Sequence, residues 1–323
     1  MFLILNFITF ESIMEGIVIK STGSWYQVID SFGHVRLCRI KGKFRIQGIK
    51  TTNPIAVGDV VDYELENEGL GGMIVGIKKR KNYIIRKSIN LSKQSHIIAA
   101  NMDQAFLIVT LFNPRTSVGF IDRFLITAEA YQIPVIIVFN KSDILTADQL
   151  AEQNNLIGLY ENIGYACVAV SATTGNNITV LKELLKDKTT LLSGHSGVGK
   201  STLVNSIEDG LELRTAEISS VHNKGMHTTT FAEMFPLKLG GFIIDTPGIK
   251  ELGLVDIKKE ELSRYFPEMK ALMDDCQFNN CLHLNEPKCA VKDALARGAI
   301  AISRYDSYLS VLSSEELQSK DYK

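Results

Sequence analysis

The chain of 323 residues is long enough for two or three domain cores, and 45% hydrophobic and 22% charged residues are ordinary for a globular protein. A formal net charge of −1 excludes a global basic excess, so a nucleic-acid partner would have to meet a local cationic patch. No stretch of sequence is typical of a membrane-spanning helix. We therefore expect a cytoplasmic protein without a membrane partner.

The N-terminal segment MFLILNFITFESI is apolar, but it is short and polar residues interrupt it. It lacks the cationic start and the small-residue cleavage site that are typical of a secretory signal peptide. We interpret residues 1–13 as an N-terminal extension, and the sequence leaves open whether translation starts at Met1 or at Met14.

Residues 14–81 consist of short strand-like runs separated by glycine turns, without helical periodicity. The runs expected to be strands lie in the segments 16–30, 33–40, 43–49, 57–65 and 71–77. Several short strands in so small a segment predict an all-β barrel of the OB-fold type. Trp25 is expected in the core of this barrel.

Cations alternate with apolar residues or glycine in the segment RIKGKFRI, so the period of two in a strand places them on one face. These cations are Arg39, Lys41, Lys43 and Arg45. A solvated outer face would explain the pattern, but residues 33–50 contain no acid, which favours contacts with RNA phosphates. The basic segment 78–93 is interpreted as a linker that is either merely soluble or extends this surface.

The pattern changes to α/β at about residue 101, where apolar strand-length runs begin to alternate with helical stretches. This alternation predicts a mostly parallel sheet that is covered on both faces. The expected strands are 105–112, 134–140, 166–172, 189–194, 229–237 and 241–247, and the expected helices are 120–132, 147–164 and 177–187. We assign residues 82–252 to this domain and residues 253–323 to a mainly helical C-terminal domain.

A phosphate-binding motif, G-x-x-x-x-G-K-[ST], stands between an expected strand and an expected helix. Its backbone N–H groups would wrap phosphates at a helix N-terminus. Lys200 would reach the β- and γ-phosphates, and the Ser201 hydroxyl would bind Mg²⁺. The expected phosphate-binding set is Gly194, His195, Ser196, Gly197, Val198, Gly199, Lys200, Ser201 and Thr202.

The tetrapeptide DTPG at 245–248 follows a buried strand. Asp245 at the tip of that strand would hold Mg²⁺ through water, and the Gly248 N–H would contact the γ-phosphate. Thr229, in the run of threonines upstream, is expected to complete the Mg²⁺ ligands with Ser201 and Asp245.

The tetrapeptide NKSD at 140–143 ends another apolar strand. The Asp143 carboxylate could accept both N1–H and N2–H of guanine, and adenine lacks this donor pair, so the motif would select guanine. Asn140 would orient the loop, the stem of Lys141 would pack over the base, and a backbone N–H of the SAT segment at 171–173 would bind O6. The expected guanine-binding set is Asn140, Lys141, Ser142, Asp143, Ser171 and Ala172.

These motifs occur in a rotated order along the chain. The usual order in GTPases is P-loop, switch threonine, DxxG, NKxD and SA, whereas here NKxD and SA precede the P-loop. The order predicts a circularly permuted, six-stranded GTPase domain. Such a cut is tolerable because the termini of compact domains often lie close together.

A cluster of soft metal ligands with the spacing C-x₄-C-x-H-x₅-C follows in the C-terminal segment, at Cys276, Cys281, His283 and Cys289. Three thiolates and an imidazole complete a tetrahedral zinc site without an open catalytic position, so we expect one structural zinc per chain. Cysteines crowded in this way suit a reduced compartment better than a disulfide framework.

The segments NKSD, GHSGVGKSTL, GMHTTT, DTPGIKELGL and CQFNNCLHLNEPKC together resemble the ribosome small-subunit-dependent GTPase A family, RsgA or YjeQ, from about residue 14 to the end. The resemblance implies an OB-fold, a permuted GTPase domain and a zinc domain. It also implies a factor in late maturation of the small (30S) ribosomal subunit, with that subunit, its rRNA, GTP and GDP as partners. His195 and Met226 depart from the family's commoner Gln and Arg, and neither change removes a phosphate ligand.

Two classes of function fit this pattern: an RNA-dependent GTPase, which we expect to be a monomer, and an RNA-binding module that holds guanine nucleotide as a structural ligand. The intact P-loop and switch residues favour the GTPase, and the barrel and zinc cluster argue against a large-subunit assembly GTPase. Ile249 stands where many GTPases carry a water-orienting Gln. His227 is therefore the candidate catalytic residue, and rRNA is the alternative source of the catalytic group.

Overall fold

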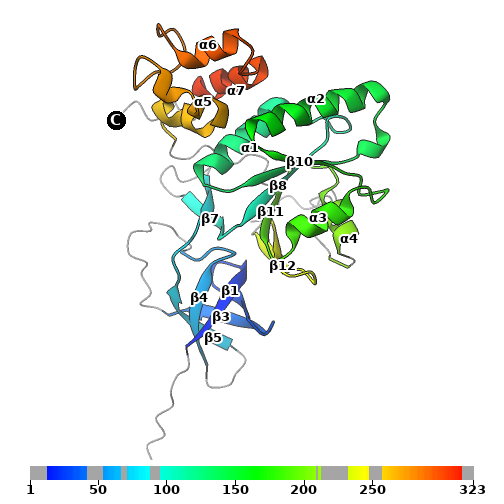
Figure 1. Ribbon diagram of the computed structural model, residues 1–323. Helices are drawn as coiled ribbons and strands as arrows, with labels where there is room; N and C mark the ends of the chain where they lie inside the picture. The colour runs from blue at the N-terminus through cyan, green and yellow to red at the C-terminus, as the bar shows by residue number, and fades with distance from the viewer. Residues whose placement is uncertain are drawn as a thin grey trace, which may run out of the picture.

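The computed structural model describes residues 13–41, 54–66, 71–87, 95–208, 210–211, 232–246 and 257–314. Three parts follow one another along the chain (Figure 1): a small barrel, a central α/β domain, and a helical C-terminal part that lies against helix α1.

The first part is a closed barrel of five strands. The strands are β1 (Met14–Ser21), β2 (Tyr26–Asp30), β3 (Val35–Ile40), β4 (Val60–Leu65) and β5 (Gly71–Ile77). They pair in the order β1-β2-β3-β5-β4, and β4 returns to β1. The barrel confirms the expected OB-like architecture. The expected segment 16–30 forms two strands around a turn, and the segment 43–49 lies outside the described residues.

The interior of the barrel follows the two-residue period of its strands. Tyr26 and Val28 of β2 are fully buried, as are Cys38 and Tyr63 on the neighbouring strands. The prediction of a core position for Trp25 is wrong, because the period that sends Tyr26 inward sends its neighbour outward. Trp25 is 40% exposed.

The basic segment after the barrel is not a plain linker. Strand β6 (Tyr83–Lys87) begins within it and pairs antiparallel with β7 (Ser95–Ala100). The hairpin forms because Ile84 and Ile85 bury their side chains. Arg80 contributes little to a free basic surface, since its guanidinium contacts both carboxylate oxygens of the buried Asp59 at 2.6 Å.

The central domain contains a sheet with the order β10-β9-β8-β11-β13-β12. Its strands are β8 (Gln104–Val109), β9 (Val135–Phe139), β10 (Ala166–Ala169), β11 (Thr189–Ser193), β12 (Glu233–Pro236) and β13 (Phe242–Asp245). Neighbouring strands are parallel except for the antiparallel edge strand β12, which confirms the expected mostly parallel sheet. Edge strand β12 also pairs with β1 of the barrel at Lys20 and Glu233.

Helices cover both faces of this sheet (Figure 1). They are α1 (Val118–Ala130), α2 (Ala147–Ile163), α3 (Ile178–Leu185) and α4 (Lys200–Ile207). Leu107 belongs to the core under α1 and α2, while its neighbour Ile108 belongs to the core under α3 and α4. This alternation explains why the strands are apolar throughout. In the described part of the chain, no helix is both long enough and apolar enough to cross a bilayer.

The C-terminal part consists of short helical elements. They are the 3₁₀ turns Lys259–Tyr265 and Met273–Asp275 and the helices α5 (Pro267–Lys270), α6 (Ala290–Ala296) and α7 (Ile302–Leu312). Its hydrophobic core includes Phe266 and Tyr308 together with Ile126 of α1. The C-terminal part therefore shares its core with the central domain.

A buried ionic network joins α7 to the central domain. The Arg304 guanidinium is fully buried and lies 2.6 Å from Asp122 Oδ1 on α1 and 2.6 Å from Glu268 Oε1 on α5. Burial opposes the Arg304 charge, but the two carboxylates outweigh it and raise the Arg304 pKa. Tyr160 of α2 donates to the same Asp122 oxygen at 2.8 Å, so three helices meet at one carboxylate.

We predict that Arg304→Met destabilises the protein by about 3–5 kcal/mol, because it leaves two carboxylates buried without their cation. Urea unfolding followed by far-UV circular dichroism would measure the change in the free energy of unfolding. Arg297→Met removes an exposed arginine from the same part of the chain and serves as the control. Equal stability of the two variants would contradict a structural role for the network.

Candidate nucleotide site and metal centre

The predicted nucleotide-binding segments lie at one edge of the central sheet. NKSD follows β9, SAT follows β10, the phosphate-binding loop follows β11, and Asp245 ends β13. These four strands are parallel, so their carboxyl ends share an edge, and open α/β sheets bind ligands at that edge.

The phosphate-binding loop needs glycine at two points. Gly194 has a φ of +147°, and a Cβ there would collide with the Ile108 carbonyl oxygen. Gly199 has a φ of +91°, and a Cβ there would lie 2.5 Å from Asn140 Nδ2. Only glycine lets the loop approach these neighbours while it turns into α4.

Two ionisable groups interact at this loop: Lys200 within it and Asp245 at the end of β13. The Lys200 ammonium donates to the carbonyl oxygens of Gly194 at 2.6 Å and His195 at 2.9 Å, and it thereby closes the loop on itself. Burial lowers the Lys200 pKa, and the negative charge of Asp245 opposes that shift. Burial likewise raises the Asp245 pKa, which the Lys200 charge opposes. Ser201 lies half-buried in the first turn of α4.

Asn140 holds the predicted guanine and phosphate segments together. Its Nδ2 donates to the Val198 carbonyl oxygen at 2.9 Å, and its Oδ1 accepts from the Ala172 N–H at 3.2 Å. Asn140 is buried, with a relative exposure of 3%. One amide therefore connects the loops that follow β9, β10 and β11.

The other NKSD residues include Lys141 and Ser142, whose contacts could not be predicted from the sequence. Lys141 adopts a left-handed φ of +63°, and its ammonium donates to the carbonyl oxygens of Asn113 and Gly197, each at 2.8 Å. The buried Gln153 of α2 donates to Ser142 Oγ at 3.2 Å. Neither Asn113 nor Gln153 belongs to a motif, so spacing could not identify them. Asp143 is exposed in the turn that follows.

Several predicted site residues have no structural description. His227, Thr229 and Gly248 lie outside the described residues, as do the barrel cations Lys43 and Arg45. Of the predicted phosphate-binding set, the loop from 194 to 202 is described throughout.

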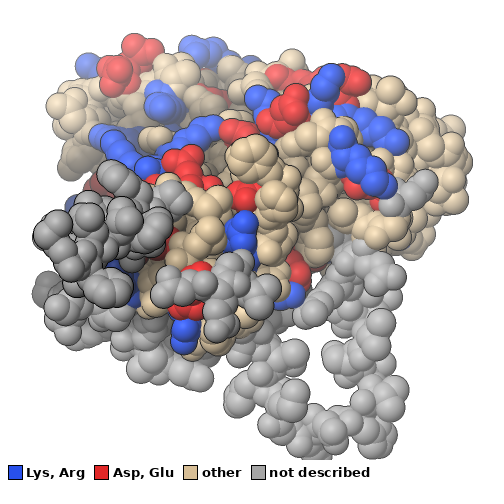
Figure 2. Space-filling view, turned by 90° about the horizontal axis from the view of Figure 1, so that it is seen from below, with Lys and Arg blue, Asp and Glu red and all other residues tan. Residues whose placement is uncertain are grey.

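The barrel cations that are described have acidic partners, contrary to the reasoning from local sequence. Arg39 contacts Glu66 at 3.0 Å and Lys41 contacts Glu64 at 3.2 Å, and these acids lie on or after β4, far along the chain. Arg39 also lies over the Trp25 ring, 4.9 Å from its centroid. Figure 2 views the molecule from the barrel end and shows Lys and Arg beside Asp and Glu over the described part of that face.

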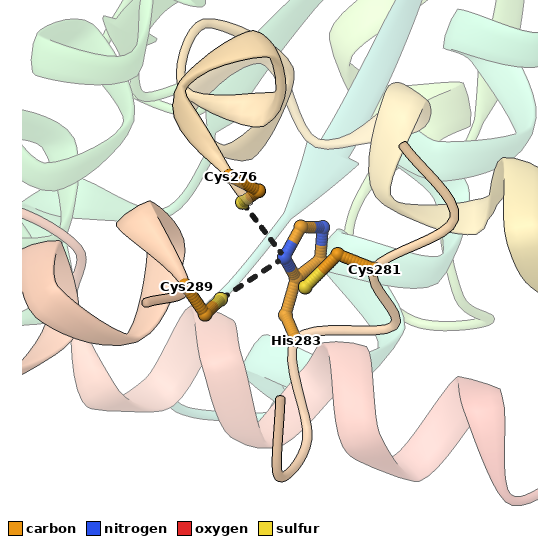
Figure 3. A group of neighbouring side chains, drawn as sticks. All are labelled: Cys276, Cys281, His283 and Cys289. Carbon is orange, nitrogen blue, oxygen red and sulfur yellow. Dashed lines mark hydrogen bonds between the residues drawn. The ribbon is translucent and has the colours of Figure 1, made fainter. Parts of the chain in front are cut away.

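The predicted metal ligands converge on one point (Figure 3). Potential ligand atoms of Cys276, Cys281, His283 and Cys289 all lie within 4.8 Å of one another. His283 Nδ1 is 3.7 Å from Cys276 Sγ and 3.3 Å from Cys289 Sγ. Tetrahedral zinc with bonds of about 2.3 Å to sulfur and about 2.0 Å to nitrogen separates ligand atoms by roughly 3.5–3.8 Å. The residues therefore fit zinc.

Helix α7 supports the loop that carries these ligands. Tyr305 donates to the His283 carbonyl oxygen at 2.6 Å, and Tyr308 donates to the Leu282 carbonyl oxygen at 2.7 Å. Glu286 closes the same loop by accepting from the N–H groups of Leu282 and Leu284. The ligands are thus held by the helix that also carries Arg304.

The protonation states of the cluster make metal binding dependent on pH. Burial raises the pKa of the Cys281 thiol to about 12 and lowers the pKa of His283. The imidazole is therefore neutral and able to coordinate at pH 7, whereas the thiols must lose protons when a metal binds. Metal affinity should accordingly fall as the pH falls.

The fold and the arrangement of loops define a P-loop GTPase whose nucleotide-binding motifs are circularly permuted. The RsgA GTPase family model matches residues 77–255, and the RsgA N-terminal domain model matches residues 15–74. The chain therefore belongs to the RsgA GTPase family and is a GTP-hydrolysing enzyme.

Relatives and solved structures agree with this assignment. A protein of Christiangramia forsetii named small ribosomal subunit biogenesis GTPase RsgA is 57% identical over 305 residues, which cover 94% of this chain and 97% of the relative. One of the same name from Flavobacterium psychrophilum is 58% identical, with 94% of each chain covered. The crystal structure of YjeQ from Thermotoga maritima aligns with a TM-score of 0.78 at 38% identity, covering 95% of this chain and 99% of that one. YloQ, described as a circularly permuted GTPase, aligns with a TM-score of 0.75 at 31% identity, covering 97% of each.

Cys281→Ala should lower the zinc content of the purified protein and destabilise its C-terminal part, because the remaining donors cannot complete a tetrahedral shell. Metal analysis and thermal unfolding would measure both effects. Cys167→Ala, which changes a half-buried cysteine outside the cluster, should retain the metal. A wild-type protein that is folded yet free of metal would contradict the assignment.

Asp143→Asn should weaken GTP binding and strengthen binding of xanthosine triphosphate, whose C2 oxygen takes the place of the guanine amino group. Titration with fluorescent analogues of GTP and of xanthosine triphosphate would measure the affinity for each nucleotide. Asp148→Asn changes an exposed carboxylate in the first turn of α2 and should bind GTP normally. Unaltered GTP affinity in the Asp143 variant would remove this residue from the site.

Proposed function

We propose that this chain binds the small ribosomal subunit and assists its late maturation, with GTP hydrolysis that the subunit stimulates. The observation that carries the proposal is the meeting of three predicted nucleotide-binding loops at the Asn140 side chain. The names of the relatives support the choice of partner. In this proposal the chain acts as a cytoplasmic monomer, and its partners are the 30S subunit with its rRNA, GTP and GDP.

Each loop binds a different part of the nucleotide. Residues 194–202 hold the phosphates, and Lys200 exchanges its two carbonyl contacts for β- and γ-phosphate oxygens. Asp143 accepts from the guanine edge while a backbone N–H of the SAT segment at 171–173 binds O6. Ser201, Thr229 and Asp245 hold the Mg²⁺ that accompanies GTP, and Gly248 contacts the γ-phosphate.

Hydrolysis requires a residue that orients the attacking water. Ile249 offers no polar group for this task, so intrinsic hydrolysis is slow. We assign the task to His227, which directly precedes the switch threonines and whose imidazole can accept a hydrogen bond from water. The zinc site is structural, with one zinc per chain, because its four protein ligands leave no open position.

RNA contacts are assigned to the barrel cations Arg39, Lys41, Lys43 and Arg45. The two ion pairs of Arg39 and Lys41 involve partly exposed side chains, so their contribution to stability is small. An RNA phosphate can replace Glu66 or Glu64 at little cost. The exposed Trp25 beside Arg39 adds a surface on which a base can stack.

The test is GTP turnover by the purified chain with small subunits, with large subunits, and with neither. Only small subunits should accelerate hydrolysis, and His227→Ala should keep GTP affinity while losing most of that acceleration. His222→Ala, in the same segment, is the matched control. Stimulation by large subunits, or tightly held nucleotide without turnover, would overturn the proposal. Stimulation that survives in the His227 variant would place the catalytic group on the ribosome.

A further inference from the structure

Helix α2, which follows the NKSD segment, turns two polar side chains inward. Its buried residues are Gln153 and Tyr160, and both are polar. They lie seven residues apart, which is close to two helical turns, so they share one face of the helix. Leucines and isoleucines of the same helix, such as Leu156 and Ile157, are only half-buried.

Packing alone does not explain the amide at position 153. A buried amide loses its contacts with water, and an apolar side chain of similar size would avoid that cost in free energy. Gln153 offsets the cost by a hydrogen bond, since its Nε2 lies 3.2 Å from Ser142 Oγ. The partner of this amide is thus a residue of NKSD.

Hydrogen bonds hold Ser142 from three directions. Its hydroxyl accepts from Gln153 and donates to the Phe139 carbonyl oxygen, at the end of β9, at 3.3 Å. Its backbone N–H donates to the carbonyl oxygen of Val170, directly after β10, at 3.1 Å. The residue directly before Asp143 is therefore fixed to two strand ends and to α2.

We propose that Gln153 is a positioning residue for guanine recognition, an inference that rests on the proposed function. Gln153 acts through Ser142, whose fixed hydroxyl sets the orientation of the turn that carries Asp143. Asp143 is exposed, and its carboxylate can accept both N–H groups of the guanine edge only when its oxygens face them. A turn that is already fixed binds the base without the cost of ordering.

The helix that carries Gln153 is itself held near both ends. At its start, the side chains of Thr146 and Gln149 form a capping box with each other's backbone N–H groups. Near its far end, the Tyr160 hydroxyl donates to Asp122 Oδ1 at 2.8 Å. Gln153 therefore projects from a supported helix and can fix the turn beside it.

The experiment compares the affinities for GTP and for inosine triphosphate, which lacks the 2-amino group of guanine. The wild type should prefer GTP by about tenfold or more, because inosine triphosphate loses one hydrogen bond to the Asp143 carboxylate. Gln153→Leu should bring this preference close to one. Asn154→Leu, at the exposed neighbouring position on α2, should keep the wild-type preference. A merely structural loss would weaken both nucleotides by the same factor, and an unchanged preference in Gln153→Leu would overturn the proposal.

The route through Ser142 is tested by removing the same hydrogen bond from its other side, without changing α2. Ser142→Ala should reduce the preference for GTP as Gln153→Leu does, and the double variant should lose no more than either single one. Additive losses, or a normal preference in Ser142→Ala, would overturn this route.

The same measurement on Asp143→Asn separates this inference from the proposed function. A wild-type preference for GTP in Asp143→Asn would overturn the guanine site itself. A preference that is lost in Asp143→Asn but kept in Gln153→Leu would overturn only the role of Gln153.

Discussion

The arrangement of the predicted nucleotide-binding loops depends on two hydrogen bonds made by one buried amide, that of Asn140. Its donor and acceptor reach Val198 in the phosphate-binding loop and Ala172 in the loop after β10. A buried amide that lost either partner would leave a polar group unsatisfied, so both loops are held at a defined distance. The permuted chain separates these loops widely in sequence, yet the parallel sheet returns them to one edge.

A second constraint concerns the placement of the C-terminal part. Its core includes a residue of α1, and its Arg304 is neutralised by a carboxylate of that same helix. Buried ion pairs contribute little net stability compared with apolar packing, but they are sensitive to geometry. Because α7 also supports the loop of the Cys/His cluster through two tyrosines, one helix orients both this cluster and the central domain.

The sequence predicted the parts of this protein that depend on local pattern: the apolar strands of the sheet, the motifs at their ends, and the cluster of three cysteines and one histidine that could hold a metal. It missed features that depend on distant partners. Glu64 on β4 and Glu66 directly after it contact the barrel cations, and Gln153 on α2 donates to Ser142 in the turn before that helix. Trp25 was wrongly placed in the core because it lies beside a turn, where the sequence does not indicate which side chains of the following strand point into the barrel. The hairpin β6–β7 was missed because charged residues surround its short buried core.

The pairing of β1 with β12 has a consequence for association between molecules. Strand β12 ends the sheet of the central domain, and such a strand offers unpaired N–H and C=O groups to another chain. Here the barrel's own first strand meets it, and the Lys20 ammonium contacts the Glu233 carboxylate at 2.8 Å. The barrel thus occupies the Glu233 end of this edge strand, where it hinders pairing with a strand of another molecule.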